Sequence, residues 1–178
     1  MHIKFFLVDH TRIAQIGKEG VRLMLGESTN VEKPGATISE RKVGETLERT
    51  FAMHEDKRII IAAFASSVNR LQQIVDICEK CGRKIVFNGR SMVNISGMAR
   101  ELGLLKVKDG TVIEPEEMHK HHYAKQCLIT TGSQGEPMSA LTRMAAGEDK
   151  IEVGAHDLVV ISSNPIPGNE KLVYTVIN

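Results

Sequence analysis

The sequence has no long apolar run, no even set of cysteines and no large excess of charge of either sign. Within its 178 residues, the apolar runs are far shorter than the roughly 20 residues that a membrane span requires. The amino-terminal stretch MHIKFFLVDH lacks the apolar core and the small-residue cleavage site of a secretory signal. These absences argue against a membrane protein and against a secreted one, so we expect a cytoplasmic protein.

The three cysteines argue for reduced thiols rather than for a disulfide framework. Cys78 and Cys81 form a C-x-x-C pair late in an apolar-periodic segment, but no second pair or nearby histidine completes a zinc site. We therefore expect cysteines on a helix face. His119, His121 and His122 stand in a polar segment, which favours a solvated connector. We expect no metal ion in this chain.

The net charge of +1 does not by itself indicate a nucleic-acid-binding protein, because such proteins usually carry a basic excess. It still permits a local basic groove, to which Arg83, Lys84, Arg90 and Arg100 could contribute. The chain contains no G-x-x-x-x-G-K-[ST] motif, and no G-x-G-x-x-G follows a predicted strand. Neither an NTPase nor a dinucleotide-dependent enzyme is therefore indicated.

Short apolar segments that alternate with segments of helical spacing are the strongest signal in the chain. Five such segments read as strands: 20–25, 58–64, 84–87, 127–130 and 158–163. Thr37 and Glu40 have the spacing of a capping box, and the helix that follows carries Val43, Leu47 and Phe51 on one face. The alternation predicts an α/β fold with a Rossmann-like parallel sheet flanked by helices, in a single domain over residues 1–178.

Small polar loops follow the predicted strands, and in a parallel sheet such loops share one edge, where ligands bind. In the loop TTGSQGEP (130–137), Gly132 and Gly135 permit close backbone approach, as an anion such as phosphate requires. Ser133 and Glu136 also have capping-box spacing. One such loop is more often only a helix cap, but five on one edge favour a binding site.

Five stretches together resemble the β-CASP region of the bacterial ribonuclease J family. They are GESTNVEKPG (26–35), FASSVNRLQQI (64–74), GRSMVN (89–94), TTGSQGEPMSAL (130–141) and SSNPIPGNEK (162–171). The similarity runs in the same order over nearly the whole chain from about residue 9, and the combination of the last two stretches is highly specific. The family consists of ribonucleases with a metallo-β-lactamase fold.

The resemblance implies a module of a metal-dependent ribonuclease that acts in RNA processing and decay, with 5′–3′ exonucleolytic and endonucleolytic cleavage. The β-CASP part contributes to the RNA channel and closes over the active-site cleft. The parent enzyme is expected to hold two divalent metal ions, taken to be zinc, and to form a homo-oligomer. The partners of this chain are then RNA and the rest of the metallo-β-lactamase domain, with no membrane.

Individual residues also receive roles from the resemblance. Glu27 falls on the first β-CASP motif, which implies a catalytic carboxylate that approaches the metal ions without binding them. The residues expected to bind RNA are Ser28, Thr29, Asn30, Arg90, Ser91, Gly132, Ser133, Gln134, Gly135, Glu136, Ser162, Ser163, Asn164, Gly168 and Asn169.

No H-x-H-x-D-H motif occurs in this chain, although the family binds its metal ions with such histidines. Those ligands lie before and after the matching region, so we expect a fragment that holds no two-metal centre and cuts no RNA alone. Two other interpretations stay open. The chain could be a free-standing α/β module that binds a nucleotide or another phosphorylated small molecule. It could also be an interaction scaffold, as Cys78, Cys81 and the histidine-rich loop suggest.

Overall fold

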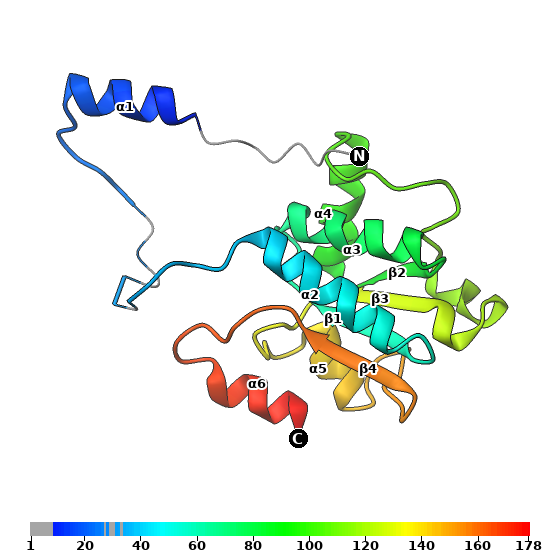
Figure 1. The fold of residues 1–178 in the computed structure, drawn as a ribbon. Coiled ribbons are helices and arrows are strands. Elements are labelled where there is room, and N and C mark those ends of the chain that lie inside the picture. Colours follow the sequence, from blue (N-terminus) through cyan, green and yellow to red (C-terminus); the bar gives the residue numbers. More distant parts are fainter. Residues whose placement is uncertain (1–8, 27, 29–30, 33) are drawn as a thin grey trace. The chain divides into compact units, whose positions relative to one another are not determined.

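The computed structural model describes residues 9–26, 28, 31–32 and 34–178 (Figure 1). They fall into two units, Met1–Ile38 and Ser39–Asn178. Helix α1 (His10–Glu19) belongs to the first unit and begins after Asp9, whose side chain accepts a hydrogen bond from the Arg12 backbone N–H. The single-domain organisation of residues 1–178 stays a prediction.

Residues 20–25 do not form the strand that their apolar sequence predicts. The segment is exposed along its length and has no strand geometry. A strand is stable only when its backbone N–H and C=O groups find partners, and none of the sheet pairings in the described residues includes this segment. The prediction of a strand here is wrong.

The second unit holds a four-stranded parallel sheet in the order β2-β3-β1-β4. Its elements in chain order are α2 (Glu40–Met53), β1 (Arg58–Ala62), α3 (Val68–Lys80), β2 (Lys84–Asn88), α4 (Arg90–Glu101), the short 3-10 helices η1 (Pro115–Lys120) and η2 (Tyr123–Lys125), β3 (Gln126–Thr130), α5 (Ala140–Ala145), β4 (Asp157–Ile161) and α6 (Glu170–Ile177). This confirms the predicted α/β fold and four of the five predicted strands. None of the helices in the described part of the chain combines the length and the hydropathy that a membrane crossing needs.

Helices cover both faces of the sheet, with α2, α3 and α4 on one side and α5 and α6 on the other (Figure 1). Alternate residues of β1 enter the two cores: Ile59 and Ile61 pack with the first group of helices, and Ile60 packs with the second. All five residues of β1 are buried. The continuous apolar run at 59–62 therefore reflects a central parallel strand, as predicted.

Helix α2 buries the face that its spacing predicts but does not begin with the predicted cap. Leu47 and Phe51 are buried in the first core. The residue before the helix is Ser39, which makes no side-chain cap bond. The Glu40 carboxylate is instead held by the Arg70 guanidinium through two hydrogen bonds of 2.9 and 2.7 Å. The helix begins at Glu40 itself, with Ser39 as the residue before it, so the Thr37–Glu40 capping box does not form.

A buried polar cluster joins β1 to β4 where the two strands begin. The Arg58 guanidinium donates to both carboxylate oxygens of Asp157, at 2.7 and 2.6 Å, and the Tyr123 hydroxyl donates to the same carboxylate at 2.7 Å. The Asp157 side chain has no exposed surface. Burial alone would raise the pKa of Asp157, but the bonds from Arg58, Gly154 and Tyr123 outweigh it and lower that pKa. Burial and the bond to Asp157 raise the pKa of Tyr123 to about 12.

The lowered pKa of Asp157 predicts a loss of stability in acid. A carboxyl whose pKa is lower in the folded state contributes stability above its unfolded pKa of about 3.9, and this contribution is lost as the pH falls through the folded pKa. The difference in unfolding free energy between the wild type and Asp157→Asn should therefore narrow from pH 7 to pH ~3. Urea denaturation at several pH values measures it.

The matched control is Asp109→Asn, which changes an exposed turn residue and should alter stability little at any pH. A difference between the wild type and Asp157→Asn that stays constant over the same range would contradict the assigned role of the Asp157 carboxylate.

Candidate nucleic-acid interface

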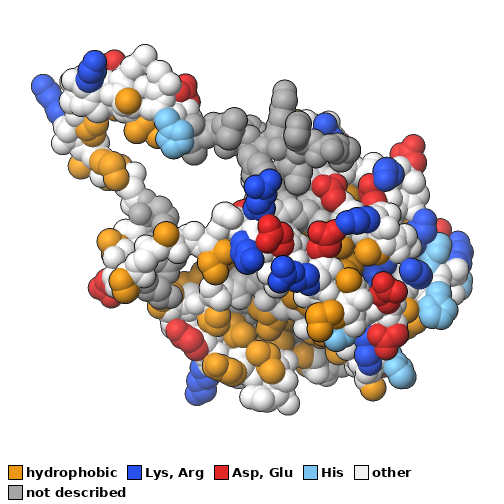
Figure 2. Space-filling model, viewed as in Figure 1, with side chains coloured by type: hydrophobic (Ala, Val, Ile, Leu, Met, Phe, Trp, Pro, Cys, Tyr) orange, Lys and Arg blue, Asp and Glu red, His pale blue; other side chains and the backbone are white. Residues whose placement is uncertain are grey.

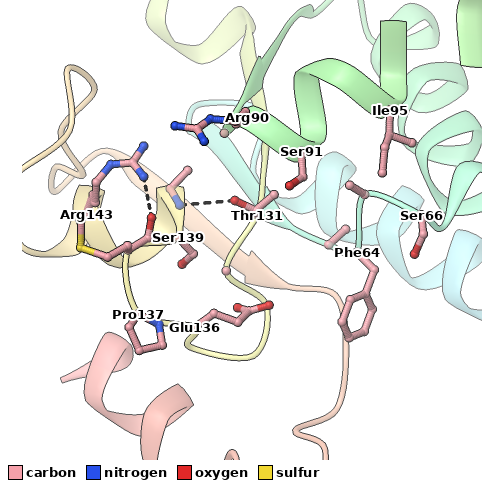
Figure 3. Close-up of a pocket in the computed structure, with 16 residues that line it drawn as sticks. Phe64, Ser66, Arg90, Ser91, Ile95, Thr131, Glu136, Pro137, Ser139 and Arg143 are labelled. Atoms are coloured by element: carbon pink, nitrogen blue, oxygen red, sulfur yellow. Dashed lines mark hydrogen bonds between the residues drawn. The ribbon is translucent and has the colours of Figure 1, made fainter. Parts of the chain in front are cut away.

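The loops that follow β1, β2 and β3 surround an open pocket of about 640 Å³ at the carboxyl edge of the sheet (Figure 3). Its polar and aromatic wall residues include Phe64, Ser66, Arg90, Ser91, Glu136 and Arg143. These loops meet because the strands are parallel, so their carboxyl ends share one edge. The pocket confirms that the loops after these three strands converge.

Two arginines line the pocket, and they differ in how far the protein itself neutralises them. The Arg143 guanidinium donates to the Met138 carbonyl at 2.6 Å and pairs with Asp149 at 2.7 Å. Arg90 is exposed at the first turn of α4, and its side chain makes no hydrogen bond or ion pair with any described residue. Arg90 is therefore the cation in this pocket whose charge is free for an anion.

Glycines bring the loops around the pocket into close contact. Gly89 has φ 97°, and a Cβ there would lie 2.6 Å from the Thr131 hydroxyl oxygen. Gly132 has φ 109°, and a Cβ there would lie 2.8 Å from the Leu141 Cβ and would overlap Ser139. Only glycine fits both the backbone and the space, so these residues shape the pocket wall.

The loop TTGSQGEP is not open to solvent along its whole length, because internal hydrogen bonds, here called the clamp, hold it to the loop after β4. Ser133 and Gln134 are 1% and 2% exposed. The Gln134 side-chain amide donates to the Ser163 hydroxyl oxygen at 2.9 Å and to the Asn164 carbonyl at 3.0 Å, and its carbonyl accepts from the Ile166 N–H at 2.7 Å. These bonds fasten the loop after β3 to the loop after β4. Ser133 and Gln134 are thus buried polar residues, although the loop follows the end of a strand.

Gly135 approaches the backbone of helix α6 closely. Gly135 has φ 66°, and a Cβ there would lie 2.5 Å from the Leu172 carbonyl oxygen and 2.6 Å from the Val173 nitrogen. The absence of a side chain at Gly135 therefore lets α6 pack on the loop.

The predicted capping box of Ser133 and Glu136 does not form. Glu136 accepts from the Gln134 N–H at 3.1 Å, and the Ser133 hydroxyl has no partner in the described structure. The helix begins later, at Ala140, and Ser139 caps it by accepting from the Thr142 N–H at 3.4 Å. Both predicted partners therefore lie before the helix cap at Ser139 and outside the first turn of the helix.

The remaining RNA-binding predictions fall at several places. Glu27, Thr29 and Asn30 lie outside the described residues, whereas Ser28 is exposed in the first unit. Ser91 is exposed in the pocket. The other predicted residues, all after β4, make internal contacts: Ser162 with Arg70, Ser163 and Asn164 with Gln134, Gly168 with Glu170, and Asn169 with Gln134. Contact of these residues with RNA stays a prediction.

Sequence reasoning missed Phe64 and Arg143, both of which line the pocket. Phe64 is the second residue after β1, and Arg143 lies one helical turn after Ser139 on α5. Phe64 was missed because the candidate residues were chosen among polar residues and glycines, and Phe64 is aromatic. Arg143 could have been found because it follows Ser139 by four residues, and residues with this spacing lie on the same face of a helix.

The cysteines and histidines do not assemble a metal site in the described residues. Burial raises the pKa of the Cys78 thiol, and a hydrogen bond with Cys127 raises it further. Cys78 lies on a buried face of α3, as predicted, and His119 is exposed in η1. No group of three His, Cys, Asp or Glu side chains that could bind a metal ion occurs in the part of the chain that the structure describes. The two metal ions implied by the resemblance therefore do not fit these residues.

A parallel sheet with helices on both faces and a cationic pocket at its carboxyl edge defines a Rossmann-like α/β domain. Residues 56–178 match the family "Ribonuclease J, beta-CASP domain", and the chain belongs to this family. It is 47% identical over 171 residues to Ribonuclease J of Mycolicibacterium smegmatis, which covers 96% of the chain and 30% of that protein.

Two further relatives show the same coverage. The chain is 42% identical to Ribonuclease J of Thermus thermophilus, over 96% of the chain and 30% of that protein. It is 41% identical to Ribonuclease J2 of Bacillus subtilis, over 94% of the chain and 30% of that protein. The chain thus spans less than a third of the length of these relatives.

Proposed function

We propose that this chain is the RNA-binding module of a ribonuclease J-like, metal-dependent ribonuclease, and that RNA phosphates bind in the pocket beside Arg90. The observation that carries the proposal is the exposed Arg90 guanidinium, which pairs with none of the described residues and lies in a pocket formed by three strand-end loops. Family membership supports the nuclease context. Arginine suits phosphate because its planar group donates several hydrogen bonds at once.

In this proposal the chain forms part of the RNA channel and closes over an active-site cleft. The cleft and two divalent metal ions belong to the rest of the parent enzyme, which cleaves RNA as a 5′–3′ exonuclease and as an endonuclease. Glu27 acts there without binding metal. This chain alone does not cut RNA, because its described residues offer no metal site. Incubation with a 5′-monophosphorylated RNA and a divalent metal ion should leave the RNA intact.

The contacts available in the pocket suit the backbone of a single strand. Arg90, Ser91 and the Ser139 hydroxyl line it, and side chains of these types hold phosphate and sugar without reading the sequence. The clamp between the loops after β3 and β4 keeps the pocket wall in place before RNA arrives. Such preorganisation lowers the ordering cost of binding.

The pocket volume also supports the second candidate, a site for a free nucleotide or another phosphorylated small molecule. About 640 Å³ falls within the size range of small-molecule pockets. A mononucleotide that binds as tightly as a longer RNA would favour this candidate. RNA that binds more tightly as its length increases would favour the RNA channel.

Arg90→Gln should weaken RNA binding and make it less dependent on salt. Loss of one phosphate contact on a single strand should make the slope of log K against log salt less negative by about 0.7. Fluorescence anisotropy with a 5′-monophosphorylated oligoribonucleotide between low and moderate salt measures the slope.

Arg100→Gln is the matched control, since Arg100 is exposed in the last turn of the same helix and does not line the pocket. Equal slopes of log K against log salt for the two variants would show that Arg90 does not contact an RNA phosphate.

A further inference from the structure

We propose that Phe64 and Glu136 form a base subsite in the pocket, in which the Phe64 ring stacks on a nucleobase and the Glu136 carboxylate accepts hydrogen bonds from its amino group. The inference rests on the proposed RNA binding and adds to it a preference among the four bases. Guanine binds best and uracil worst at this position.

Phe64 is the observation that points to a base. Of the three phenylalanines in the described residues, Phe51 and Phe87 are buried at 1% and 8% exposure, whereas Phe64 is 39% exposed and lines the pocket. It is the second residue after β1, and the residue before it, Ala63, is still bonded to the sheet, since the Ala63 N–H donates to the Thr130 carbonyl at 3.0 Å. An aromatic ring held on a rigid strand end is a stacking platform for any base.

Glu136 supplies the group that distinguishes the bases. Its side chain is exposed, and one carboxylate oxygen accepts from the Gln134 N–H at 3.1 Å. The other oxygen has no hydrogen-bond partner among the described residues, and none of their cations pairs with this carboxylate. Gln134 thus orients the carboxylate while leaving its charge available to a ligand.

A carboxylate is only an acceptor of hydrogen bonds, so it favours bases that present donors. Guanine presents two adjacent donors on its Watson–Crick edge, and adenine and cytosine each present an amino group. Uracil presents one N–H between two carbonyl oxygens, which a carboxylate repels. Single-stranded RNA exposes these edges to a protein.

The pocket has room and charge for the rest of the nucleotide. In Figure 3 the Phe64 ring and the Glu136 carboxylate lie toward one end, and the guanidinium groups of Arg90 and Arg143 lie toward the other. A phosphate beside Arg90 would therefore leave its base near Phe64. The same cavity separates a phosphate-binding end from a base-binding end.

The test titrates this chain with four 5′-monophosphorylated dinucleotides, each of a single base, by calorimetry. We expect the guanosine dinucleotide to bind at least about fivefold more tightly than the uridine one. Glu136→Gln should reduce this ratio to near one. Phe64→Ala should weaken binding of all four dinucleotides by about fivefold or more, which is the range for loss of base stacking. The affinities of Phe64→Leu should lie between those of the wild type and those of Phe64→Ala.

Glu101→Gln is the control for net charge, because Glu101 is an exposed residue at the end of α4 and should keep the wild-type ratio. Melting curves show whether each variant is folded. Equal affinity for all four dinucleotides, or an unchanged ratio in Glu136→Gln, would overturn the base subsite while leaving RNA binding in place. No binding of any dinucleotide or of longer RNA would overturn the proposed function itself.

Discussion

Gly135→Val should lower the free energy of unfolding by about 3–5 kcal/mol, the range of a severe packing and backbone defect. A Cβ at this position would lie 2.5 Å from the Leu172 carbonyl oxygen and 2.6 Å from the Val173 nitrogen. Backbone atoms of a helix cannot swing aside as a flexible side chain can. The φ of 66° adds strain, because β-branched residues rarely adopt positive φ. Helix α6 must therefore move off the loop.

The matched control is Gly147→Val, which separates strain from overlap. Gly147 has a similar φ of 71°, but no atom lies within 4 Å of its Cβ position. In this variant only backbone strain should lower the free energy of unfolding, by about 1–3 kcal/mol. Thermal and urea denaturation of both variants measures the difference. Equal losses at Gly135 and Gly147 would show that α6 does not press on the loop.

The sheet could be predicted from the sequence because its signal is local. The segments 59–62 and 127–129 are apolar throughout, and each lies between helical segments, so burial on both faces follows from the residues themselves. The run at 20–25 is apolar too, yet it is exposed and unpaired. Strand formation needs a neighbour, and apolar composition alone does not supply one.

The candidate site was predicted less well because polar residues in loops do not show from sequence which way they face. Gln134 looked like a ligand-binding residue, but its partners lie about 30 residues further along the chain, at Ser163 and Asn164. Gly135 looked free to approach a phosphate, and it approaches Leu172 instead. Contacts between residues distant in sequence decide both placements, and contact of either residue with RNA stays a prediction. Arg90 and Ser91 line the pocket, and their contact with RNA stays a prediction.

The clamp also explains how a pocket made of loops keeps its shape. Gly132 and Glu136 lie on the pocket wall, and the buried Gln134 side chain stands between them in sequence. Each hydrogen bond from Gln134 to the loop after β4 fixes the wall against a second segment. Removing the amide should therefore disturb the pocket as well as the fold.

Gln134→Leu should lower the free energy of unfolding by about 2–4 kcal/mol, because it removes all the hydrogen bonds that the buried Gln134 side chain makes to the loop after β4. The groups that lose their bonds are the Ser163 hydroxyl, the Asn164 carbonyl, the Ile166 N–H and the Asn169 side-chain amide. Amide hydrogen exchange at Ile166 should also become faster than in the wild type, since its acceptor is gone. Urea denaturation and exchange measured by NMR test the two effects separately.

Gln73→Leu gives the same substitution in a different bonding environment. Gln73 is 7% exposed, but its amide makes one bond, to the Glu40 carbonyl at 3.1 Å, and its carbonyl oxygen has no partner in the described structure. The free energy of unfolding of Gln73→Leu should therefore fall by at most about 1 kcal/mol, which is the net contribution of one hydrogen bond. If the two variants lost equal stability, burial of the side chain and not saturation of its hydrogen bonds would set the cost, and the clamp would lose its physical basis. A larger loss at Gln134, together with weaker RNA binding per folded molecule, would connect the clamp to the shape of the pocket.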